Sequence, residues 1–138
     1  MRVLHFVQSI EPLQGGGLGQ AALGLHLAMR SLCPSKIVAT RDAEFQASQP
    51  DLIQCVRKGL PSIYYSPALH QVARDLVKET DWIHGHGLYV GTNWIFGAET
   101  IKQHKRLCYH THGFFDPWIL NRSAGLGQPK DQGRNGSE

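Results

Sequence analysis

Short apolar runs alternate with longer amphipathic segments along most of the chain. The opening run Arg2–Val7 is rich in β-branched and apolar residues, which predicts a buried strand. Apolar residues then recur at helical spacing over about Leu18–Leu32, and Pro34 ends this helix because the residue before a proline avoids the α region. The polar and glycine-rich segment between the strand and the helix, Ser9–Gly16, is expected to be a loop.

The same alternation continues through most of the remaining chain. We expect further strands at Lys36–Thr40, Leu52–Arg57, Asp81–His84 and Leu107–His110, and further helices at Pro67–Glu79 and Tyr89–His104. Strands that alternate with helices predict the α/β fold class, as a Rossmann-like open parallel sheet with right-handed crossovers. In the usual strand order of such a sheet, the first strand lies beside the fourth. In the last helix, Trp94 and Phe96 are expected to face the core.

Three glycine- and histidine-rich stretches each come after a predicted strand. They are Gly15-Gly16-Gly17-Leu18-Gly19, His84-Gly85-His86-Gly87 and His110-Thr111-His112-Gly113. In open α/β sheets, ligands bind outside the carboxyl ends of the strands, where the strand order reverses. The stretches therefore predict one binding site built from the loops Ser9–Gly19, Gly85–Gly87 and Thr111–Phe114.

The histidines divide according to their place in this pattern. His86 and His112, each followed by glycine and each predicted to lie past a strand end, are the candidate site residues. The others are expected to be core residues (His84 and His110 at strand ends, His5 and His26 inside a strand and a helix) or surface residues (His70 and His104). The two H-x-H pairs could also form a zinc site, but no aspartate lies at a known ligand spacing, and we expect no metal.

The glycine-rich loop is compatible with two kinds of ligand. Gly17–Ala22 matches G-x-G-x-x-A, a form of the dinucleotide fingerprint, and Asp42 follows the second strand at about the right distance for its acidic residue. That fingerprint needs a tight turn directly after the first strand, whereas Gln8–Gln14 predicts a roomy loop. We therefore favour a phosphate or a sugar at the glycines, and an NAD(P)-binding oxidoreductase fragment is the alternative.

Composition narrows the functional classes further. The chain has 138 residues, enough for one domain with a core, and its net charge of +3 is spread without a lysine or arginine run. This argues against nucleic-acid binding and suits anionic small ligands or acidic lipid headgroups. Three cysteines without paired spacing fit a reducing cytosol, and we expect neither a signal peptide nor a membrane span. The polar end of the chain predicts a folded domain over residues 1–123 and a disordered tail over residues 124–138.

Taken together, the motifs give the chain a family resemblance. It resembles the N-terminal domain of GT-B glycosyltransferases of family 4, a retaining group that uses nucleotide sugars. The similarity rests on Gly15–Gly19 after the first strand, on Asp81–His86 and on Thr111–Gly113, and it covers about Met1 to Ser123. The run His112–Trp118 is similar to members that build bacterial surface polysaccharides.

The resemblance implies a role for each motif. In that family two Rossmann-like domains face each other across a cleft, and no metal or cofactor is required beyond the donor substrate. The residues implied at the donor diphosphate are Gly15, Gly16, Gly17, Gly19 and Gly113. The resemblance further implies that His112 is the catalytic residue at the donor sugar, and that His86 and Ser9 line the side of a carbohydrate or lipid-linked acceptor. The implied location is the cytoplasm, with peripheral contact to the inner membrane surface left open.

The chain departs from the family after Ser123. The family's C-terminal domain, with its basic residue and E-x7-E pair, does not follow. The resemblance therefore implies a truncated member that is inactive alone, and a non-catalytic remnant is a further alternative.

Overall fold

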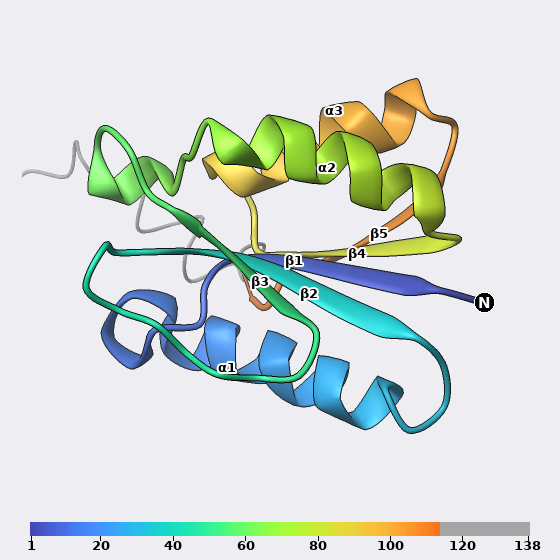
Figure 1. The fold of residues 1–138 in the computed structure, drawn as a ribbon, viewed down its shortest axis with the longest axis horizontal. Coiled ribbons are helices and arrows are strands. Elements are labelled where there is room, and N and C mark those ends of the chain that lie inside the picture. The colour runs from blue at the N-terminus through green and yellow to red at the C-terminus, as the bar shows by residue number, and fades with distance from the viewer. Residues whose placement is uncertain (114–138) are drawn as a thin grey trace, which may run out of the picture.

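The computed structural model describes residues 1–113, which form one five-stranded parallel sheet (Figure 1). The strands are β1 (Val3–Ser9), β2 (Ser35–Arg41), β3 (Leu52–Val56), β4 (Trp82–His86) and β5 (Arg106–His110), in the order β3-β2-β1-β4-β5. The predicted Rossmann-like open sheet is confirmed, and the first strand lies beside the fourth. The strand order reverses between β1 and β4, so the expected ligand position is the carboxyl end of these two strands.

Helices cover both faces of the sheet. Figure 1 shows α1 (Pro12–Met29) on one side and α2 (Ala68–Glu79) with α3 (Gly91–Lys102) on the other, and a short 3-10 turn, Pro61–Ile63, precedes α2. Within residues 1–113, no helix has the length and apolar character needed to cross a membrane. The predicted domain boundary at residue 123, the tail 124–138 and the segment Phe114–Trp118 lie outside the described residues.

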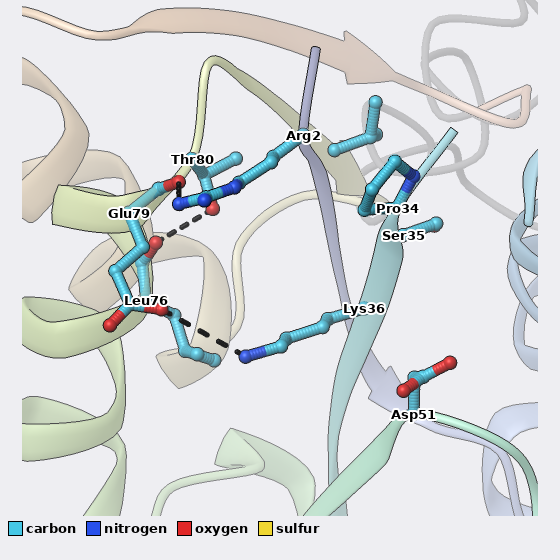
Figure 2. A pocket seen from close by; sticks show the side chains of 9 residues that line it. Arg2, Pro34, Ser35, Lys36, Asp51, Leu76, Glu79 and Thr80 are labelled. Carbon is cyan, nitrogen blue, oxygen red and sulfur yellow. Dashed lines mark hydrogen bonds and ion pairs between the residues drawn. The ribbon is translucent and has the colours of Figure 1, made fainter.

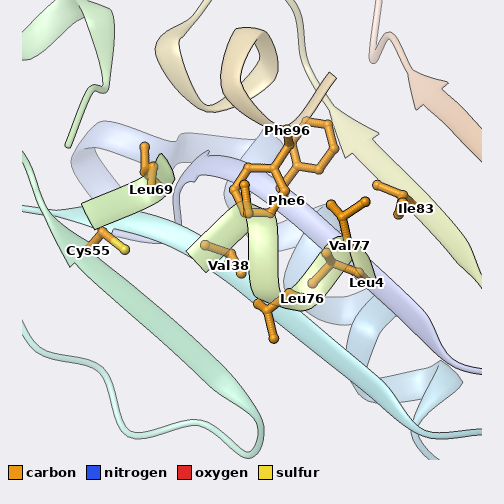
Figure 3. Close-up of a cluster of buried hydrophobic side chains, with 10 residues drawn as sticks. Leu4, Phe6, Val38, Cys55, Leu69, Leu76, Val77, Ile83 and Phe96 are labelled. Carbon is orange, nitrogen blue, oxygen red and sulfur yellow. The ribbon is translucent and has the colours of Figure 1, made fainter. Parts of the chain in front are cut away.

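The larger core lies between the sheet and the helices α2 and α3. Its buried members, drawn in Figure 3, include Leu4, Phe6, Val38, Ile83, Leu69, Val77 and Phe96. Phe6 and Phe96 stack with ring centroids 5.0 Å apart. The prediction for Phe96 is confirmed, but the one for Trp94 is wrong. The Trp94 side chain faces solvent rather than the core, and the residue is 58% exposed.

A smaller core lies beneath α1, and His26 joins it to the sheet. The apolar members are Val7, Ile10, Ala22, Ile37 and Ala39. The His26 ring is fully buried, with Nδ1 2.8 Å from the Ser35 hydroxyl and Nε2 3.0 Å from the Pro50 carbonyl oxygen. Since the carbonyl can only accept, Nε2 carries the proton and Nδ1 accepts from Ser35. The prediction that His26 is structural is therefore confirmed.

The predicted loop Ser9–Gly16 is wrong in its second half. Helix α1 begins at Pro12, a residue that suits a first helical turn, so only Ile10 and Glu11 separate it from β1. Gly16 has φ 51° and ψ −146°, which breaks the helical path, and the main body of α1 restarts at Gly17. The start of this helix was not predicted from the sequence because the segment contains a run of glycines, and glycine is a poor helix former.

Candidate functional site

The loops after β4 and β5 meet at the carboxyl edge of the sheet. His86 Nδ1 lies 3.1 Å from His112 Nε2, and the Gly87 amide donates to the His110 carbonyl oxygen at 3.0 Å. A turn with positive φ at His112 (48°) and Gly113 (85°) follows β5. The side chain of His112 thus contacts the end of the neighbouring strand, as the prediction of one site from several loops requires.

Histidines fill one face of β1, β4 and β5, which we call the imidazole face: His5, His84, His86 and His110. The register pairs His5 with His84 and His86 with His110, so these side chains point to the same side. His5 Nδ1 lies 3.1 Å from His86 Nε2, and His84 Nδ1 lies 3.3 Å from His110 Nε2. The His86 and His110 rings stack at 5.0 Å with only 10° between their planes. The two H-x-H pairs are therefore one packed array rather than two separate loops.

The imidazole face favours neutral rings. Burial, followed by the neighbouring His84, lowers the pKa of His5 to about 3, and burial, followed by His5, lowers the pKa of His86 to about 3. Burial, followed by His110, also lowers the pKa of His84 and of His112. At neutral pH the rings of His5, His84, His86 and His112 are therefore uncharged, and each has one N–H donor and one bare acceptor nitrogen.

The glycines of the predicted diphosphate site fall into two groups. Gly15 and Gly19 are buried against the turn after β1, where an added Cβ would overlap the Ser9 carbonyl oxygen. At Gly16 and Gly17, and at Gly113 after β5, an added Cβ would meet nothing within 4 Å. The first pair is needed for packing of α1 on the strand end, and the second group leaves space for a ligand.

The two residues predicted on the acceptor side are not at the surface. His86 is not past the strand end but is the last residue of β4, and it is 1% exposed. Ser9 is fully buried, and its hydroxyl accepts a hydrogen bond from the Glu11 amide at 3.1 Å. In this conformation both side chains are therefore shielded from solvent and out of reach of a ligand. His112, by contrast, is exposed.

A charged cluster at the same edge was missed by sequence reasoning. Arg57 Nη2 lies 3.1 Å from Glu11 Oε1 and 2.6 Å from Asp42 Oδ1, and the side chains of Arg57 and Glu11 are only 5% and 8% exposed. The Asp42 amide also donates to Glu11 Oε1 at 2.8 Å. The cluster ties together the segments after β1, β2 and β3. The sequence feature that could have predicted this cluster is the charged residue that closely follows each of these three strands, two acidic and one basic.

A pocket also lies away from this edge. A pocket of about 490 Å³ is lined by residues at the amino ends of β1 and β2 and the end of α2, among them Arg2, Lys36 and Glu79 (Figure 2). Parallel strands place their amino ends opposite their carboxyl ends, so this pocket is separate from the imidazole face. Across residues 1–113, no group of three or more histidine, cysteine, aspartate or glutamate side chains could hold a metal ion.

Comparisons with known proteins do not assign a family. Neither a scan against protein-family models nor a search among curated proteins finds a match to this chain.

Proposed function

We propose that this chain is the N-terminal domain of a GT-B glycosyltransferase of family 4, which takes part in sugar transfer from a nucleotide sugar to a carbohydrate or lipid-linked acceptor. The observation that carries the proposal is the placement of His112. It is exposed at the carboxyl edge and hydrogen-bonded to the buried His86, whose strand lies at the point where the strand order reverses. The proposed location is the cytoplasm, on or near the inner membrane surface.

The proposal gives the glycines and His112 different tasks. The body of α1 starts at Gly17, and the first amides of a helix have no partners within it, so they are suited to binding a diphosphate. His112 is uncharged at neutral pH and therefore acts on the donor sugar through a hydrogen bond rather than as a cation. The nucleotide sugar is a substrate, and the proposal includes no metal or cofactor.

The proposal also limits what this domain does alone. In the family that it resembles, a second domain grips the nucleotide, and transfer needs donor and acceptor held together across the cleft. We therefore expect the described domain to bind a nucleotide sugar weakly and to transfer no sugar by itself.

The alternative of dinucleotide binding rests on the short connection from β1 to α1, which is tighter than the sequence predicted. Two observations weaken it. The G-x-G-x-x-A match starts at Gly17, after the kink and well inside α1, rather than at the turn. The carboxylate of Asp42, which would receive the ribose, is paired with Arg57.

Titration of the isotope-labelled chain followed by NMR separates the two functions. With UDP-glucose or GDP-mannose we expect shifts of the Gly16, Gly17 and Gly113 amides at millimolar ligand, while the amide of Gly24, on the exposed face of α1, serves as the control. Shifts with NAD but not with any nucleotide sugar would favour the alternative. No shift at the three glycines with any of these ligands would overturn the proposed function.

A further inference from the structure

Three imidazoles form a continuous chain of hydrogen bonds from the core to the surface. His5 Nδ1 meets His86 Nε2 at 3.1 Å, and His86 Nδ1 meets His112 Nε2 at 3.1 Å. Exposure rises along the chain, since His5 is 0% exposed, His86 is 1% exposed and His112 lies at the surface. The outermost ring is the residue that the proposed function places at the sugar.

The inner end of the chain decides the direction of its hydrogen bonds. Each neutral ring has one N–H, so the bonds run either all outward or all inward. In the described part of the molecule, His5 Nε2 is buried and has no hydrogen-bond partner. An inward chain would put an N–H on that nitrogen with nothing to accept it, whereas an outward chain leaves only a bare lone pair there. Buried N–H groups without partners are the rarer and costlier case, which favours the outward direction.

We infer that His5 and His86 are positioning residues that hold His112 in one tautomer, with Nε2 accepting from His86 and the proton on Nδ1. His112 then offers a ligand a hydrogen-bond donor and no free acceptor nitrogen. A donor of this kind recognises a sugar hydroxyl oxygen or a phosphate oxygen. The inference rests on the proposed function for the identity of the ligand, but not for the tautomer itself.

The same geometry excludes a proton relay through these rings. A relay needs a second group at its inner end that can give or take a proton. In the described residues the inner nitrogen of the chain, His5 Nε2, has no hydrogen-bond partner. Two further rings pack on His5, His84 at 5.1 Å and His26 at 5.9 Å between centroids, and both His26 nitrogens are used by Ser35 and Pro50. No group is therefore hydrogen-bonded to the inner end to exchange a proton with it, and the chain fixes orientation instead.

The neighbouring pair His84 and His110 provides a matched control. These rings lie on the same face and form one hydrogen bond of 3.3 Å with each other. The described contacts include no hydrogen bond from either ring to His112. A change at His84 disturbs the packing of the imidazole face without removing the donor to His112.

Long-range ¹H–¹⁵N NMR spectra of the full chain at neutral pH test the inference, because they report which ring nitrogen carries the proton. We expect His112 to be protonated on Nδ1 in the unaltered protein. His86→Asn keeps an amide donor near the position of Nδ1 and should preserve this tautomer. His86→Gln moves the donor toward the position of Nε2, and the fixed Nδ1–H tautomer of His112 should be lost. His84→Gln should leave it unchanged.

Two results would overturn the inference. One is His112 protonated on Nε2 in the unaltered chain, which decides the question even if the variants fail to fold. The other is an unchanged tautomer in a folded His86→Gln variant. Neither spectrum needs a nucleotide sugar, so a failed sugar titration with the expected tautomer would reject the proposed function alone.

Discussion

The strands β1, β4 and β5 have two chemically opposite faces. Side chains toward α2 and α3 are apolar, whereas the alternate side chains on the other side include the four histidines of the imidazole face. The apolar set includes Leu4, Phe6, Ile83 and the partly buried Leu107. Successive residues of a strand point to opposite sides, so a shift of one position exchanges one environment for the other.

The contrast separates stability from site building. Burial of a large apolar side chain stabilises the fold by about 1.5–3 kcal/mol. A buried imidazole gives less, because it loses its bonds to water and is held neutral. The rings of the imidazole face recover part of that loss through bonds with one another. We therefore assign most of the folding free energy to the apolar face and the placement of His112 to the imidazole face.

The largest expected effect comes from breaking the apolar face. Phe6→Ala removes a fully buried ring that stacks on Phe96, and we expect the free energy of unfolding to fall by about 3–5 kcal/mol in urea denaturation. Trp94→Ala is the matched control, since this aromatic residue on α3 is 58% exposed. The loss of its side chain should change the free energy of unfolding by less than about 0.5 kcal/mol. Similar losses in the free energy of unfolding for the two changes would show that Phe6 is not part of the core as described.

The imidazole face should make the fold sensitive to acid. His5 and His86 have pKa values of about 3 when folded and 6.5 when unfolded, so the unfolded chain binds more protons between these limits. Their contribution is complete above pH 6.5 and declines as the pH falls toward 3. For each ring, the free energy of unfolding should fall by about 2 kcal/mol as the pH is lowered from neutral to about pH 5.

Urea unfolding at several pH values measures this dependence, and His5→Phe should make it shallower. His70→Ala, at an exposed position on α2, should leave it unchanged. A free energy of unfolding that stays flat from neutral pH to about pH 5 would contradict the buried, neutral state of these rings.

A smaller effect on stability should distinguish Gly15, which packs against the end of β1, from Gly17, which leaves open space. Gly15→Ala places a methyl group against the Ser9 carbonyl and should destabilise by about 1–3 kcal/mol. Gly17→Ala meets nothing within 4 Å, and alanine favours a helix, so stability should stay the same or rise by up to about 1 kcal/mol. The second change should nonetheless weaken nucleotide-sugar binding, because the added methyl group narrows the approach to the backbone. Equal destabilisation by both changes would contradict the distinction between Gly15 as a packing residue and Gly17 as a residue beside open space.

The sequence predicted the open parallel sheet with the first strand beside the fourth, and it predicted that the loops after β4 and β5 meet at one edge, because β-α alternation is typical of this sheet and its usual strand order. It did not predict the chain through His5, which looked like an ordinary strand residue. Its partner His86 is 81 positions away, and their meeting depends on a parallel register that no local pattern reveals. Likewise, the H-x-H spacing indicated one shared face but not that His86 would be buried and His112 exposed.

The central claim is that the imidazole face holds His112 for ligand binding while the fold does not depend on that residue. The most direct measurement is the Kd of His112→Ala for the nucleotide sugar that binds the unaltered chain, taken by NMR titration together with urea unfolding. We predict a Kd about tenfold higher, roughly 1.4 kcal/mol of binding free energy, with the free energy of unfolding unchanged within about 0.5 kcal/mol. An unchanged Kd in an equally stable variant would contradict the claim.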